Sequence, residues 1–317
     1  MGRYILRRLI QAIPLLIGIS LISFFIMRLT PGGPLAGYLM NPQVSPADIA
    51  RIEKMWGLDQ PLYIQYFKWF WSMLQGDWGV SYRTGLPVFA TILGRLPATL
   101  ELMFAAFVMA LAVAIPVGIY SATHRYSPFD YAATVGAFLG VALPSFWFGL
   151  MMQLGFSVKL AWLPSAGMAT IGAGFSVIDR LRYLIMPTIV LGLINMAGWS
   201  RYMRSSMLDA INQDYVRTAR SKGLAEKVVV NRHALKNALI PVVTMMGLDL
   251  PVLFSGAAIT ERIFAWPGMG RLYIEAVFMR DYPILMGVLM LTATLVVFGN
   301  LVADLTYGLL DPRIKYQ

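Results

Sequence analysis

The sequence predicts an all-α protein that crosses a membrane several times. Hydrophobic residues occupy 58% of its 317 positions and charged residues only 13%, which is more apolar surface than a soluble domain can bury. The apolar residues gather in six runs, each near the ~20 residues with which a helix crosses a ~30 Å hydrocarbon core. Lys and Arg concentrate between some of these runs, and such segments stay in the cytoplasm. We therefore expect six transmembrane helices with both termini cytoplasmic.

The first apolar run, 9–27, follows Arg3, Arg7 and Arg8. These flanking arginines predict a cytoplasmic N-terminus. A cleaved signal peptide is the alternative, but the run is longer than a typical signal core and no clear small-x-small cleavage site follows it. We expect residues 1–29 to form an N-terminal segment and a retained first span.

Residues 30–97 form the longest hydrophilic interval, which is rich in aromatic residues and divided by prolines and glycines. Ser45 and Pro46 predict the N-cap and first turn of a helix over Ser45–Trp56, and an amphipathic helix is expected over Pro61–Leu74. Because the charges of the interval nearly cancel, we expect a compact external subdomain. Its aromatic residues are more typical of interfacial anchoring and a small core than of a ligand site.

Residues 98–317 are expected to form the core transmembrane domain. The 28 residues of 131–158 carry no charge and can span with tilt or with a kink at Pro144. We expect the intervals 159–182 and 261–281 on the external side of the membrane. The apolar runs of this domain are 102–123, 131–158, 183–200, 239–260 and 282–303.

The most basic long segment, Asp214–Pro241, lies between the fourth and fifth apolar runs. Its charge excludes it from hydrocarbon and predicts a cytoplasmic loop. We expect a short helix with Asp214 as its N-cap and an end at Gly223, which can adopt the left-handed conformation that ends helices. This helix would be a knob that fits a groove on a soluble partner, although a solvated loop that only sets topology is the alternative. Its apolar face would carry Tyr215, Val216 and Ala219.

The residue order of this segment is A-R-S-K-G, nine residues, then H-A-L-K-N-A-L-I-P. It resembles the cytoplasmic loop of ABC-transporter permeases, most closely those of the dipeptide/oligopeptide/nickel type. Arg217 and Thr218 stand where the general consensus E-A-A-x-x-x-G has Glu and the first Ala, whereas Ala219 and Gly223 match it. The resemblance implies a coupling helix, within a coupling loop over 205–237, that docks on an ATP-hydrolysing subunit. The residues implied in this coupling are Asp214, Tyr215, Arg217, Thr218, Ala219, Arg220, Lys222 and Gly223.

Other segments are similar to the same family, including Arg3–Leu9 and, in the expected external subdomain, Trp56–Pro61 and Gly76–Ser81. Glu261–Leu272 contains W-P-G-M-G, and its resemblance implies a re-entrant turn near the outer mouth of the transport pathway. A tight connection that seats two helices is the alternative. We expect the tryptophan at the membrane interface. The residues of this turn are Trp266, Pro267, Gly268 and Gly270.

Asp249 is the one acidic residue deep in an apolar run. A charge at a helix centre costs about 2.5–3.5 kcal/mol on insertion scales, so the carboxylate should face a cavity or a partner. Pro251 interrupts the backbone hydrogen bonds nearby. We expect Asp249 and Pro251, and more weakly Asn195, to line the transport pathway. The alternative for Asp249 is a structural hydrogen bond to a neighbouring helix, or a protonated acid.

The residues for several classes of chemistry are missing. The chain has no cysteine and its two histidines are isolated, so no metal site is expected. No G-x-x-x-x-G-K-[ST] occurs, so no P-loop is expected. We expect no catalytic residue, no enzymatic activity and no cofactor in this chain, and the resemblance implies that partner subunits bind ATP and Mg²⁺. The net charge of +10 reflects membrane topology rather than a nucleic-acid partner.

The resemblance implies a permease subunit of an ATP-driven ABC importer in a bacterial or archaeal cytoplasmic membrane, which moves di- or oligopeptides or similar small solutes. The resemblance implies a second homologous permease, two ATP-binding subunits and an external substrate-binding protein or lipoprotein, in contact with membrane lipid. A self-sufficient secondary carrier or channel is the alternative. Such carriers often show inverted repeats and paired intramembrane charges, and neither is clear in this sequence.

Overall fold

The chain is mainly helical throughout residues 2–35, 44–254 and 256–310, which are the residues described by this computed structural model. No β-strand occurs in these ranges, and an isolated bridge joins Val80 to Pro87. The all-α prediction is therefore confirmed. The chain divides into two compact units: unit 1 comprises Met1–Thr99, Phe254–Ala258 and Pro267–Gln317, and unit 2 comprises Leu100–Leu253 and Ile259–Trp266. The domain limits expected from the sequence (1–29, 30–97 and 98–317) stay a prediction.

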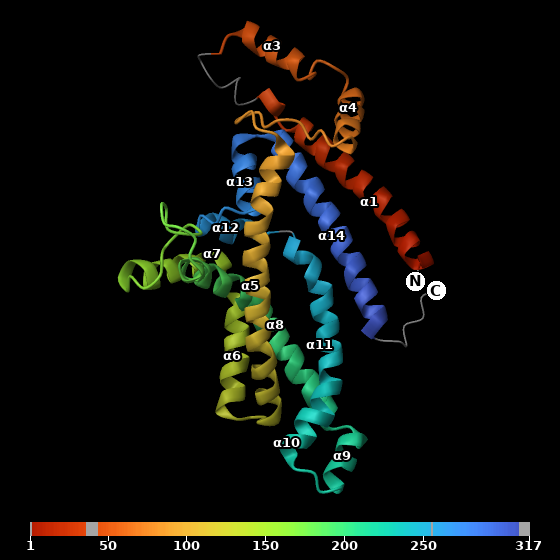
Figure 1. The fold of residues 1–317 in the computed structure, drawn as a ribbon, viewed down its shortest axis with the longest axis vertical. Coiled ribbons are helices and arrows are strands. Elements are labelled where there is room, and N and C mark those ends of the chain that lie inside the picture. The colour runs from red at the N-terminus through yellow and green to blue at the C-terminus, as the bar shows by residue number, and fades with distance from the viewer. Residues whose placement is uncertain (1, 36–43, 255, 311–317) are drawn as a thin grey trace. The chain divides into compact units, whose positions relative to one another are not determined.

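Two long helices of unit 1, α1 (Gly2–Leu29) and α14 (Tyr282–Leu310), lie side by side (Figure 1). Val88 and Ile92 are wholly buried in a core that includes Ile284 of α14. Met27 of α1 packs against the same core, so apolar packing joins α1, α14 and the segment that contains Val88 and Ile92. The other helices of unit 1 are η1 (Gly33–Leu35), α3 (Pro46–Met55), α4 (Leu62–Leu74), the start of α5 (Val88–Thr123) and α13 (Met269–Met279).

The two helices predicted between the first and second spans are confirmed as α3 and α4. The Ser45 hydroxyl caps α3 by accepting a hydrogen bond from the Asp48 N–H at 3.2 Å. A second hydrogen bond, from the same hydroxyl to the Asp48 carboxylate, lowers the pKa of that carboxyl. Helix α4 is tied to α1 by the hydroxyls of Tyr66 and Ser20, which lie 2.8 Å apart and are both buried. The local cap and the buried hydrogen bond thus hold these helices in unit 1.

Unit 2 is built around α8 (Val177–Ile211), which packs against α6 and α11. The last part of α5 also belongs to this unit. Its close approach to α8 requires a glycine: a Cβ added at Gly118 would lie 2.5 Å from the Met203 Cβ. The remaining helices are α6 (Pro128–Ala142), α7 (Ser145–Met152), η2 (Gln153–Lys159), α9 (Asp214–Ser221), α10 (Glu226–Val228), η3 (Val229–Ala234), α11 (Leu235–Asp249), η4 (Leu250–Phe254, which reaches unit 1) and α12 (Ala258–Ile263).

The span expected over 131–158 is sharply bent at Pro144, and whether the two parts cross the membrane as one span stays a prediction. Helix α6 ends at Ala142, and Pro128–Ala142 and Ser145–Lys159 are bent by 105° relative to each other. Leu143 is extended, with ψ 125°, because the ring of Pro144 disfavours helical backbone at the residue before it. The proline therefore breaks the helix rather than kinking it.

Four of the described helices are long and apolar enough to cross a membrane, over Ile5–Leu29, Val88–Thr123, Glu226–Phe254 and Tyr282–Asp304. They become five if the bent pair counts as one span. A multi-pass membrane protein is thus supported by length and composition. The count of six spans and the cytoplasmic position of both termini stay predictions.

Candidate functional site

The predicted helix before Gly223 is present as α9. The Lys222 and Gly223 N–H groups donate to the carbonyls of Thr218 at 3.1 Å and Arg220 at 2.9 Å, and Gly223 has φ +76°. Its left-handed end is therefore as predicted, but its N-cap is not Asp214. Gln213 is the N-cap, with φ −74° and ψ 151°, and Asp214 is the first helical residue. The negative charge of Asp214 is stabilised there by the positive end of the helix dipole.

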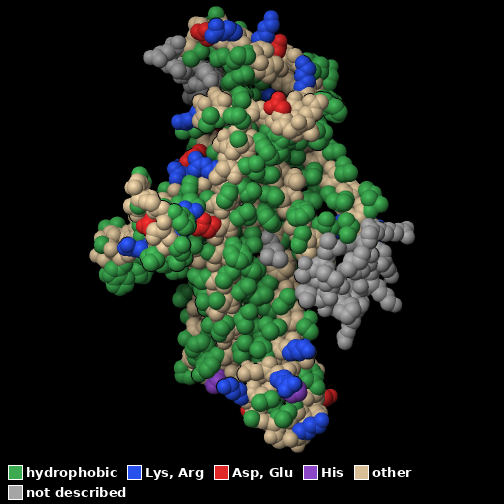
Figure 2. All heavy atoms as spheres, viewed as in Figure 1, with side chains coloured by type: hydrophobic (Ala, Val, Ile, Leu, Met, Phe, Trp, Pro, Cys, Tyr) green, Lys and Arg blue, Asp and Glu red, His purple; other side chains and the backbone are tan. Residues whose placement is uncertain are grey.

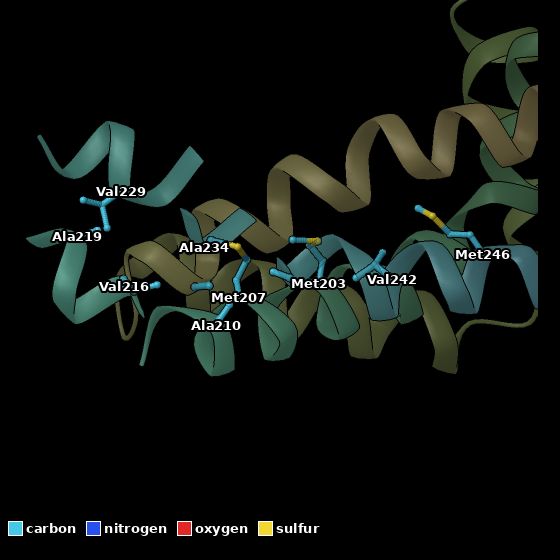
Figure 3. Close-up of a cluster of buried hydrophobic side chains, with 11 residues drawn as sticks. Met203, Met207, Ala210, Val216, Ala219, Val229, Ala234, Val242 and Met246 are labelled. Atoms are coloured by element: carbon cyan, nitrogen blue, oxygen red, sulfur yellow. The ribbon is translucent and has the colours of Figure 1, made fainter. Parts of the chain in front are cut away.

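Helix α9 is anchored by two buried side chains. Val216 is 0% exposed and Ala219 is 4% exposed, and both belong to a cluster with Val229 of η3 and Met207 of α8 (Figure 3). Tyr215, expected on the same face, is instead 40% exposed. On a helix Ala219 lies between Tyr215 and Val216, and the core approaches from the Val216 side. The anchor leaves the opposite side of α9 facing solvent.

Basic side chains gather at the end of unit 2 that carries α9 and α10 (Figure 2). Arg217 is 78% exposed and pairs only loosely with Asp214 at 3.6 Å, and Lys222 is also exposed. Arg220 differs, because its Nε and Nη2 donate to the Glu226 carboxylate at 3.1 and 2.7 Å. These hydrogen bonds raise the pKa of Arg220, which stays charged. Arg217 and Lys222 are thus presented outward, whereas Arg220 closes the turn between α9 and α10.

A buried ion pair, missed by the sequence analysis, holds α8 shortly before it leads into α9. The Asp130 side chain is 4% exposed and accepts from Arg204 Nε at 2.7 Å and Nη2 at 2.8 Å. It also accepts from the Ser121 hydroxyl and from the Tyr126 N–H, and Tyr126 has φ +62°. The network ties α8 to the turn between α5 and α6. The S-x-x-D pattern Ser127–Asp130 was a readable helix-start signal, but it does not reveal the arginine.

Asp249 makes the structural hydrogen bond that was the alternative to a pathway role. The Trp199 Nε1–H of α8 donates to Asp249 Oδ2 at 2.9 Å. Helix α11 ends at Asp249, a 3-10 segment follows, and Pro251 within it is buried. Asn195 is exposed on α8. The assignment of these three residues to the transport pathway stays a prediction.

The residues of the predicted outer turn fall in both units, with Trp266 in unit 2 and Pro267, Gly268 and Gly270 in unit 1. The Trp266 side chain is 0% exposed, so it packs inside unit 2 and does not itself face lipid. Its position at the membrane interface stays a prediction. The Arg180 guanidinium lies 5.5 Å from the Trp266 ring centre and also holds Glu101 through hydrogen bonds of 2.7 and 2.6 Å. This arginine thus covers one face of the buried indole. The role of the turn at the outer mouth stays a prediction.

The structure shows no group of three His, Cys, Asp or Glu side chains that could hold a metal ion within the described ranges. The proposal that ATP and Mg²⁺ belong to partner subunits therefore rests on other grounds.

Comparisons with known proteins match the whole chain. The family described as "Binding-protein-dependent transport system inner membrane component" matches residues 114–316, and its N-terminal counterpart matches residues 1–103. The chain is 46% identical over 317 residues to the oligopeptide transport system permease protein AppB of Bacillus subtilis (strain 168), with 100% of both chains covered. It is 39% identical over 338 residues to the dipeptide transport system permease protein DppB of Escherichia coli (strain K12), again with 100% of both covered.

A solved structure shares the fold. It is the crystal structure of an amino acid ABC transporter with histidines, with a TM-score of 0.50 and 15% identity over 69% of this chain and 93% of that chain. At this identity the likeness concerns the fold alone. The match of the family to residues 114–316, together with relatives aligned from end to end, shows that the chain belongs to the binding-protein-dependent transport system inner membrane components.

Proposed function

We propose that this chain is a permease subunit that moves di- or oligopeptides, or similar small solutes, through a bacterial cytoplasmic membrane as part of an ATP-driven ABC importer. Relatives named as oligopeptide and dipeptide permeases, aligned over their full length, support the solute class. The single observation that carries the mechanism is α9, whose apolar side is built into unit 2 and whose basic side is free to meet a partner. We infer the direction of transport, import, from the family to which the chain belongs.

The ATP-hydrolysing partner would bind the exposed residues of α9. Arg217 and Lys222 suit acidic or polar groups on that partner, and Tyr215 and Thr218 are also exposed. Because Val216 and Ala219 are locked among buried side chains of α8 and η3, α9 would move with those helices. The Asp130–Arg204 network would pass the displacement to the α5–α6 turn. A rigid transmission of this kind converts closure of the ATPase pair into a change of access.

The proposed assembly contains a second homologous permease, two ATP-binding subunits and an external substrate-binding protein. ATP and Mg²⁺ would bind to the ATP-binding subunits, and this chain would supply no catalytic group. Helices α3 and α4 in residues 30–97 would face the external binding protein. Within this division of labour, α9 and the external helices are the two points at which the chain meets soluble partners.

The natural absence of cysteine allows a direct test by single-cysteine cross-linking. Arg217→Cys should cross-link to the ATP-binding subunit in the assembled complex, and the yield should change when ATP is added. Arg51→Cys on the exposed surface of α3 is the matched control and should give no such product. Cross-linking of α9 to no nucleotide-hydrolysing subunit, or uptake by the isolated chain in liposomes, would contradict the proposal in favour of a secondary carrier or channel.

A further inference from the structure

Unit 1 contains a cavity of about 290 Å³ enclosed by the end of α1, the residue after α3, α4, the segment 77–82 and the start of α14. This volume is near the lower end for small-ligand pockets. The rings of Trp56 and Tyr82 in its wall are stacked 3.7 Å apart at 6°. The aromatic side chains that line it are Phe24, Trp56, Trp69, Trp78, Tyr82 and Tyr282.

A single arginine, Arg28, lines this aromatic cavity from the last turn of α1. It is partly buried, and its guanidinium lies 5.2 Å from the centre of the Phe24 ring. None of the carboxylates that the structure describes lies within ion-pair distance of Arg28. Its electrostatic neighbours are the phenols of Tyr82 and Tyr282. The cavity therefore presents a cation that the described part of the chain does not neutralise.

The neighbouring phenol does not supply the missing negative charge. Burial raises the pKa of Tyr82, so its hydroxyl stays neutral. Arginine in turn stays protonated in proteins, and its planar fork matches a carboxylate with two parallel hydrogen bonds. A partly desolvated guanidinium beside neutral rings thus favours a carboxylate from a ligand.

An acidic residue lines the same cavity at an exposed position. Asp77 uses Oδ1 to accept the Gly79 N–H at 2.9 Å, and a carboxylate has further acceptor sites that can bind an ammonium group. The faces of the tryptophan rings can take an apolar side chain, and they also attract cations. One cation, one anion and aromatic walls together form a complement to a small zwitterion with an apolar side chain.

We propose that this cavity binds an amino acid or short peptide, with the ligand carboxylate on Arg28, its ammonium group toward Asp77 and an apolar side chain against the tryptophan rings. The choice of a peptide as ligand rests on the proposed function, whereas the charge complementarity does not. The site would hold solute on the permease itself, between the expected external subdomain and the ends of α1 and α14. It also revises the expectation that the aromatic residues of this subdomain serve only as anchors and core.

The test uses the full chain in phosphatidylcholine nanodiscs and the dipeptide Ala-Phe as the probe. We expect saturable binding, measured by tryptophan fluorescence and calorimetry. The C-terminal amide of the same dipeptide should bind at least about tenfold more weakly, because it lacks the charge that pairs with Arg28. Arg28→Gln should lose a similar factor for the free acid but not for the amide, and Arg28→Lys should lose less. Arg51→Gln, on the exposed surface of α3, is the control and should bind like the parent.

Equal binding of the acid and the amide, or parental binding by a folded Arg28→Gln, would overturn the proposal. Binding of an anionic phospholipid added to the nanodiscs, with no binding of Ala-Phe, would also overturn the proposal and would identify a lipid headgroup as the occupant. If Arg28→Gln does not fold, Asp77→Asn decides: it should weaken the free dipeptide but not its N-acetyl derivative. ATP-dependent uptake by the assembled complex is measured separately. Peptide binding without uptake would contradict the transport function but support the binding site. Uptake without binding to the isolated chain would contradict the binding site but support the transport function.

Discussion

Two partly buried arginines, one in each unit, meet opposite surroundings. The Arg204 side chain is 28% exposed and makes two hydrogen bonds to Asp130, whose own side chain is 4% exposed. Arg28 lies over the Phe24 ring beside the phenols of Tyr82 and Tyr282, with no carboxylate close enough for an ion pair among the described residues. A guanidinium with an internal carboxylate stabilises the arrangement of helices that brings the pair together. A guanidinium without one can recruit a carboxylate from a ligand.

The difference is also one of energetics. Removal of one partner from a buried ion pair leaves the other charge uncompensated, which costs far more than the pair contributes. Removal of an arginine that has no carboxylate partner leaves no charge uncompensated; for Arg28 the hydrogen bond with Tyr82 is lost. The same type of substitution should therefore have unequal effects on stability in the two units.

The largest effect is expected from Asp130→Ala. The substitution leaves the Arg204 guanidinium without its acceptor. It also removes the acceptor of the Tyr126 N–H, and this hydrogen bond helps to hold the Tyr126 backbone at φ +62°. We expect a loss of about 2–3 kcal/mol in unfolding free energy, at the low end for a broken buried pair because water still reaches Arg204. The measurement is thermal or denaturant unfolding in detergent.

Glu226→Ala provides the matched control for Asp130→Ala. The Arg220–Glu226 pair has the same two-bond geometry, but its side chains are 41% and 60% exposed. Exposed pairs contribute little, so the change should stay within about 1 kcal/mol. If the two variants were equally stable, the Asp130–Arg204 network would not stabilise the packing of α8 against the α5–α6 turn.

Features that depend on neighbouring residues could be predicted from the sequence, whereas contacts between distant residues could not. The cap at Ser45 and the end of α9 at Gly223 were readable because each depends on a residue type and its immediate neighbours. The Asp130–Arg204 pair joins residues 74 positions apart, so no local pattern points from one to the other. The exposure of Tyr215 and the complete burial of Trp266 were not predicted for a related reason. Neither the periodicity of a helix nor the residue types of a turn show which neighbouring side chains cover a residue.

An intermediate effect is expected from Gly223→Val, which tests α9 itself. A β-branched residue at φ +76° is strained by roughly 1–3 kcal/mol, and this should distort the end of α9 while its anchor at Val216 and Ala219 remains. We expect uptake to fall at least about tenfold while membrane insertion is unchanged and ATP hydrolysis continues. Transport and ATPase rates of the reconstituted complex are the measurements.

Gly172→Val is the control for this variant, since Gly172 also has positive φ, at +80°, but lies in an exposed segment of unit 2 away from α9. Comparable backbone strain there should leave coupling intact. Normal uptake by Gly223→Val would mean that α9 does not transmit the motion of the ATPase.

The smallest effect on stability, and the sharpest contrast with Asp130→Ala, is expected from Arg28→Gln. Glutamine removes a partly desolvated charge that has no ion-pair partner in the described part of the chain, so unfolding free energy should change by less than about 0.5 kcal/mol or should rise. Thermal unfolding should show this in the absence of peptide, and added Ala-Phe should raise the melting temperature of the parent but not of the variant. A large loss of stability without peptide would mean that Arg28 is a structural residue like Arg204. The two arginines would then differ only in the partners that hold them, and Arg28 would not be available to bind the carboxylate of a ligand.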